Sequence, residues 1–158
     1  MATLSEMIAN QLKEMYNLAF GYVQEKHYRE AENTYENILT LCTVAKYEQG
    51  KKMAYLSLAN LCVVMEEPLK AFQYAVCAHK LSGEEELEEQ ARQLMRKLMG
   101  PLIKSGMRKE QEGDWDEAIE IYRMALPYLG EKQRAMILQE LTVLEEYQNG
   151  RQENRGHA

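Results

Sequence analysis

The side chains best suited to chemistry are three histidines and three cysteines, namely His27, His79, His157, Cys42, Cys62 and Cys77. The only group that suggests a metal site is Cys77-x-His79, with Cys62 on a neighbouring predicted helix. Residues two apart on a helix diverge, and this spacing matches no familiar zinc pattern. We therefore predict no metal site and no cofactor. The odd cysteine count at apolar helical positions indicates reduced thiols in the core.

Catalytic motifs do not occur in this sequence either. It contains no Gly-rich phosphate loop, no Gly-x-Ser-x-Gly and no His-Glu-x-x-His. The carboxylates occur in solvated runs, such as the one within residues 84–89, and nothing indicates a pair with divided pKa values. We therefore predict that the chain is not an enzyme and assign no catalytic residue.

Composition favours a helical protein and argues against some classes of partner. The 158 residues suit one domain, and three prolines and nine glycines leave room for long helices rich in Leu, Glu, Gln, Lys, Met and Ala. The net charge of −6 argues against nucleic acid as a partner, because phosphate binding needs a basic face. Neither a secretory signal nor a membrane span is evident, so we expect a cytoplasmic protein with no membrane partner.

Hydrophobic periodicity predicts an all-α fold with short turns. The first helix begins at the capping box Thr3-x-x-Glu6 and runs to about residue 25. Further helices are expected at about 28–43, 45–65, 68–81, 115–126 and 132–147, and the fifth begins at about residue 84, where residues 84–99 extend a helix that also carries Ser105 and Gly106. The pair Gly100-Pro101 must kink or divide the fifth helix. We expect one domain over residues 1–148 and a disordered tail over 149–158.

Three copies of a short pattern organise these helices. Ala31, Ala71 and Ala118 are each followed by apolar residues four and seven positions later, which places the three on one helical stripe. The helix that precedes each of these alanines also carries a small residue or two, namely Ala19, Ala59, Ser105 and Gly106. The pattern resembles the tetratricopeptide repeat, although the repeat alanines lie 40 and 47 residues apart and the usual period is about 34.

The resemblance implies a right-handed α-solenoid of three TPR-like hairpins, at about 4–43, 45–81 and 84–129, with a C-terminal capping helix at about 132–147. In that family the first helices of the hairpins line a concave groove that binds ligands. The corresponding groove residues would be Tyr16, Phe20, Val23, Met53, Leu56, Asn60, Val63, Ile103, Met107 and Glu110. The family's carboxylate clamp is not expected, because only Asn60 and Lys104 correspond to it.

This mainly apolar set of groove residues is open to two interpretations. It could bind an apolar or amphipathic peptide or helix. Alternatively, its members could be core residues covered by a neighbouring helix, a terminal segment or a second protomer. The leading hypothesis is a non-enzymatic protein–protein interaction module, an adaptor or scaffold. The second is a self-assembling structural protein whose groove or terminal helix forms a homodimer. The third is a dedicated chaperone or regulator of one partner protein.

Overall fold

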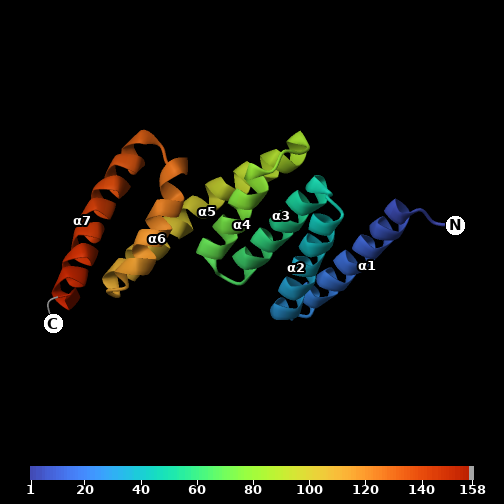
Figure 1. Ribbon diagram of the computed structural model, residues 1–158, viewed down its shortest axis with the longest axis horizontal. Coiled ribbons are helices and arrows are strands. Elements are labelled where there is room, and N and C mark those ends of the chain that lie inside the picture. The colour runs from blue at the N-terminus through green and yellow to red at the C-terminus, as the bar shows by residue number, and fades with distance from the viewer. Residues whose placement is uncertain (157–158) are drawn as a thin grey trace. The chain divides into compact units, whose positions relative to one another are not determined.

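The computed structural model describes residues 1–156 as a succession of α-helices joined by short turns, with no strand in that range (Figure 1). The predicted all-α class is therefore confirmed for these residues. His157 and Ala158 lie outside the described residues. The elements are α1 Leu4–Gln24, α2 Tyr28–Val44, α3 Glu48–Val64, α4 Pro68–Lys80, α5 Glu85–Gln111, α6 Trp115–Ala125, the 3₁₀ turn η1 Leu126–Tyr128 and α7 Glu131–Gly156.

Local sequence signals account for most of these boundaries. At the start of α1, the Thr3 side chain accepts from the Glu6 backbone N–H and the Glu6 carboxylate accepts from the Thr3 N–H, each at 3.1 Å. This is the predicted capping box, which satisfies donors that have no partner within the helix. Pro68 begins α4 as expected, since its missing N–H costs nothing there.

One helix settles an alternative that the sequence left open, and another is longer than predicted. The helix α5 continues through Pro101, so of the two expectations for Gly100-Pro101, a kink or a division, the division does not occur. The helix α7 continues to Gly156, so the prediction of a disordered tail is wrong for residues 149–156. Contacts near that end help to order it: Gln148 Nε2 donates to Asp116 Oδ1 at 2.6 Å, and the Arg151 guanidinium lies over the Trp115 ring.

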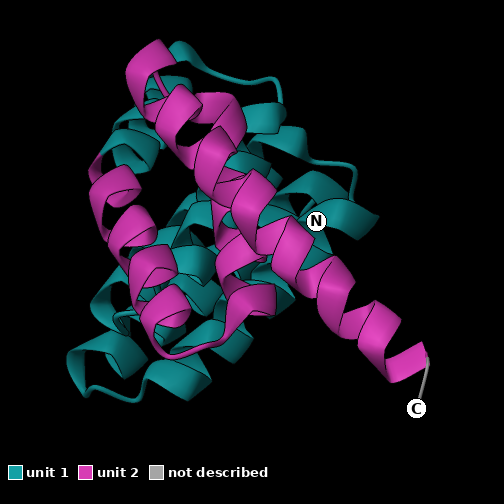
Figure 2. Ribbon diagram, turned by 90° about the vertical axis from the view of Figure 1, so that its left-hand side faces the viewer, with its two compact units in different colours: residues 1–96 teal, residues 97–158 magenta. Residues whose placement is uncertain are grey.

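The chain divides into two compact units, residues 1–96 and residues 97–158 (Figure 2). The boundary falls within α5, between Arg96 and Lys97. A single domain over residues 1–148 remains a prediction.

In the first unit, α1 packs on α2, α2 on α3 and α3 on α4, in chain order. The small residues singled out by the repeat lie at these contacts and are fully buried, namely Ala19, Ala31, Ala59 and Ala71. One core cluster contains Ile38, Cys42 and Ala54, with side chains of α1 packed against it. A small side chain at these places lets two helix backbones approach closely, which is the role the repeat predicted.

The turns repeat as regularly as the helices. After α1, the Lys26 N–H donates to the Val23 carbonyl and the His27 N–H donates to the Tyr22 carbonyl. This is the Schellman arrangement, which requires a left-handed residue just after the helix. The same hydrogen bonds close α2, α3 and α5. The left-handed residues are Lys26, Lys46, Glu66 and Gly113, with φ of 62°, 56°, 58° and 79°.

A buried charge cluster fixes the beginning of α5 in the first unit. Lys52 of α3 is 0% exposed, and its Nζ donates to the Leu81 carbonyl at 2.9 Å and to Glu88 Oε2 at 2.5 Å. The other Glu88 oxygen lies 2.5 Å from His79 Nδ1. Burial opposes the ionisation of Glu88, but the hydrogen bonds to Lys52 and His79 outweigh it and lower the pKa of Glu88. The cluster therefore links α3, α4 and α5.

In the second unit, α7 packs on α6 through Ile137, Leu141 and Leu144, which are buried. The Tyr122 ring of α6 lies against Gly106 of α5, where an added Cβ would come within 2.5 Å of the ring. Gly106 is therefore one of the small residues on which this packing depends.

Candidate binding surfaces

The predicted groove residues of α1 form one stripe along the helix. Tyr16, Phe20 and Val23 are spaced four and three residues apart, so they share a face. Phe20 is 61% exposed, whereas Tyr16 and Val23 are half-buried. An exposed phenylalanine flanked by partly covered apolar neighbours is the part of α1 best suited to a partner.

The predicted residues of α3 do not all reach the surface. Met53 and Val63 are 42% and 43% exposed, and Asn60 is exposed as well. Leu56 is only 4% exposed and packs with Ala78 and Ala91. Its assignment to an accessible groove is therefore wrong, because this side of α3 faces α4 and the start of α5.

The stripes of α1 and α3 meet at a cleft of about 530 Å³, which we call the α1–α3 cleft. It brings together two predicted groove residues, Tyr16 and Met53, from different helices. The complete lining is Ser5, Ile8, Ala9, Leu12, Tyr16, Cys42, Ala45, Lys46, Tyr47, Gly50 and Met53. Most of these side chains are apolar, and the size lies in the usual range for a binding pocket.

Sequence reasoning missed the part of this cleft that the α2–α3 turn provides. Lys46 and Tyr47 reach the cleft because the left-handed conformation of Lys46 reverses the chain. Gly50 allows this close approach, since a Cβ there would lie 2.6 Å from Cys42 Sγ. The glycine in the first turn of the helix is the one sequence signal that could have indicated the crowding.

The hydroxyl of Tyr16, a residue of the cleft lining, is an unusual polar group. Its oxygen is buried, and no hydrogen bond of ordinary length and angle reaches it from the described residues. Ser57 lies near enough to influence Tyr16, but the Ser57 hydroxyl already donates to the Met53 carbonyl at 3.0 Å. Burial raises the pKa of Tyr16 to about 12, so the hydroxyl keeps its proton at neutral pH and can donate it to an acceptor.

The remaining predicted groove residues belong to the second unit. Met107 is 52% exposed, and Ile103 is half-buried. Glu110 is also half-buried and lies close to Tyr122 and Glu140. Burial and the neighbouring Glu140 carboxylate raise the pKa of Glu110. Glu110 therefore takes part in the packing of α5 with α6 and α7, in addition to any role at a surface.

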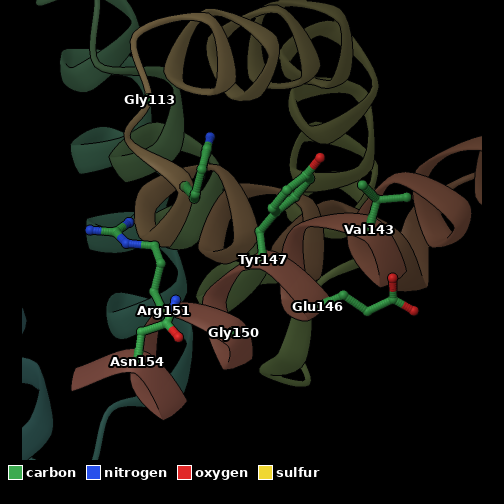
Figure 3. A pocket seen from close by; sticks show the side chains of 8 residues that line it. Gly113, Val143, Glu146, Tyr147, Gly150, Arg151 and Asn154 are labelled. Carbon is green, nitrogen blue, oxygen red and sulfur yellow. The ribbon is translucent and has the colours of Figure 1, made fainter. Parts of the chain in front are cut away.

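A second cleft, of about 780 Å³, lies between the start of α6 and the end of α7 (Figure 3). Figure 3 shows Glu146 toward one end of its lining, with Arg151 and Asn154 toward the other. The Trp115 and Tyr147 ring centroids are 5.2 Å apart, and the Arg151 guanidinium lies 5.3 Å from the Trp115 centroid. Since these side chains contact one another, their first effect is to hold α7 on α6.

The positions of the cysteines and of the other metal-ligating side chains can be compared with the predictions from the sequence. Within residues 1–156, no three His, Cys, Asp or Glu side chains are close enough to hold a metal ion. Cys42 and Cys62 are buried as expected, and burial raises the pKa of Cys62 to about 11. Cys77 is exposed, so the prediction that all three thiols lie in the core is wrong for Cys77.

The comparisons with known proteins identify no family for this chain. No protein-family model matches the sequence, and no curated protein is significantly similar to it. None of the helices between residues 1 and 156 combines the length and apolar character needed to cross a bilayer.

Proposed function

We propose that this chain is a non-enzymatic protein-interaction module that binds an apolar or amphipathic peptide or helix of a partner. The binding face would be the accessible surface of α1 and α3, formed by Tyr16, Phe20, Val23, Met53, Asn60 and Val63. The observation that supports this most is the exposure of Phe20, Met53 and Val63 on helices that also border an apolar cleft. Complete burial of one such side chain contributes about 1.5–3 kcal/mol, so a few suffice for specific binding.

The proposal includes a fold of three TPR-like hairpins stacked as a right-handed solenoid. The recurrence of one turn geometry supports it, because Lys26, Glu66 and Gly113 each precede a repeat alanine by five residues. Repeated hairpins that bury faces against their neighbours are typical of proteins that present extended binding surfaces.

Selection of peptides from a display library against the immobilised chain tests the function. Individual selected peptides are then measured by fluorescence anisotropy. We expect Phe20→Glu and Val63→Glu to weaken their binding at least tenfold while helicity stays unchanged. Leu56→Glu is unsuitable as a variant, since Leu56 lies in the core.

Leu18→Glu provides the matched control. Leu18 is an exposed apolar residue of the same helix, but two positions turn a helix by about 200°, which places it opposite the stripe of Phe20. Leu18→Glu should leave peptide affinity unchanged. If Phe20→Glu has no effect, or if Leu18→Glu is equally damaging, the assignment of the face is wrong.

Self-assembly is a second candidate, favoured by a different stripe of α1. Leu4, Met7 and Leu18 are all exposed and share one side of this helix, at spacings of three and eleven residues. Light scattering after size exclusion decides it. A dimer that Leu18→Glu converts to a monomer supports self-assembly through α1, and a monomer at every concentration excludes it.

A further inference from the structure

The α1–α3 cleft has a shape and lining that suit an apolar group. Its volume of about 530 Å³ is large enough to admit a bulky side chain together with adjoining backbone. Ile8, Leu12 and Met53 contribute aliphatic or thioether surface, and Tyr47, which is 44% exposed, contributes an aromatic ring. A methionine at the rim can adapt to side chains of different shape.

One uncompensated positive charge lies among the lining residues. Lys46 is the only charged residue in the lining, is exposed, and forms no ion pair with any acidic residue in the described part of the chain. Glu48, two residues further along the chain, pairs with Lys51 at 3.7 Å, and Glu6 of α1 belongs to the capping box. The charge of Lys46 therefore favours an anionic ligand and disfavours a cationic one.

We propose that the α1–α3 cleft is the anchor pocket for an acidic amphipathic peptide. An apolar side chain of the peptide would enter the cleft, and a carboxylate beside it would face Lys46. This inference rests on the proposed function and specifies the class of partner for the same face.

Two capped dipeptides serve as defined probes, N-acetyl-Asp-Phe-amide and its charge-reversed partner N-acetyl-Lys-Phe-amide. The full chain is labelled with ¹³C at its alanine and methionine methyl groups and titrated by NMR. The methyl groups of Ala9, Ala45 and Met53 line the cleft, whereas the buried methyl of Ala118 lies in the other unit and serves as control. We expect saturable shifts of the cleft methyls with the aspartyl probe and at least tenfold weaker binding of the lysyl probe.

Lys46→Gln separates the charge at the cleft from its apolar lining. This variant should abolish the discrimination between the two probes without affecting the fold, because Lys46 is exposed. Unshifted cleft methyls, equal affinities of the wild-type chain for the two probes, or undiminished discrimination in Lys46→Gln would each overturn the proposal.

The same titration distinguishes this proposal from the broader function. Phe20 and Val63 lie outside the cleft lining, so Phe20→Glu should not change dipeptide binding. Dipeptide binding without any Phe20-dependent peptide from the display library would support the pocket and refute the larger face. Phe20-dependent peptides that bind equally well to wild type and to Lys46→Gln would support the face and refute the pocket.

Discussion

Lys52 and Glu88 form one buried pair, but replacing Lys52 and replacing Glu88 should change the free energy of unfolding by very different amounts. The Lys52 side chain is 0% exposed, and the Leu81 carbonyl is its only other hydrogen-bond partner among the described residues. Glu88→Gln would keep an oxygen acceptor near Lys52 but leave the ammonium without its counter-charge. Breaking a buried pair in this way costs about 3–5 kcal/mol. Because the Glu88 side chain is 22% exposed and admits some water, we expect the lower end, about 3 kcal/mol.

Lys52→Met is the matched control. Methionine retains most of the volume and removes the charge, while Glu88 stays partly solvated and close to His79. Replacing a buried ion by an apolar residue is often nearly neutral, so we expect a change within about 1 kcal/mol. The double variant Lys52→Met/Glu88→Gln should cost no more than Lys52→Met, because no buried charge is then left uncompensated.

Urea denaturation followed by circular dichroism measures these differences. The expected order places Glu88→Gln about 2 kcal/mol below Lys52→Met in free energy of unfolding, with similar m-values. Equal losses in the two single variants, or a larger loss in Lys52→Met, would refute the argument that burial of the lysine charge dominates this cluster.

The remaining predictions concern pH and packing. The pKa of Glu88 is lowered on folding, so its contribution to stability is present above the ordinary value of 4.5 and is lost as pH falls through the lower folded value. On acidification, the free energy of unfolding of Lys52→Met should therefore fall less than that of the wild-type chain. Gly106→Ala should cost about 1–3 kcal/mol by contact with the Tyr122 ring. Trp115 fluorescence during urea unfolding can follow this variant. Ala118→Leu should overpack the hairpin and lower the free energy of unfolding by about 1–3 kcal/mol, and an unchanged urea midpoint would contradict this. Gly113→Ala should lower the melting temperature through a cost of about 1 kcal/mol, because alanine disfavours its positive φ.

Local signals in the sequence were sufficient to place the helices. The Thr3–Glu6 capping box, Pro68 at the start of α4 and the apolar spacing around Ala31, Ala71 and Ala118 depend only on neighbouring residues. Such signals act within one or two turns of helix, so they can be recognised without knowledge of the fold. Even so, they left open whether α5 divides at Pro101, and they did not predict that α7 extends to Gly156.

The accessible surface, in contrast, depended on packing between helices. Phe20 and Leu56 are both apolar residues on first helices of predicted hairpins, yet Phe20 is exposed and Leu56 is in the core. Periodicity shows which residues share a stripe, but the neighbouring helices decide which stripe they cover. The α1–α3 cleft likewise arises because the reversal at Lys46 brings Tyr47 beside α1, a meeting of distant segments that no local pattern records.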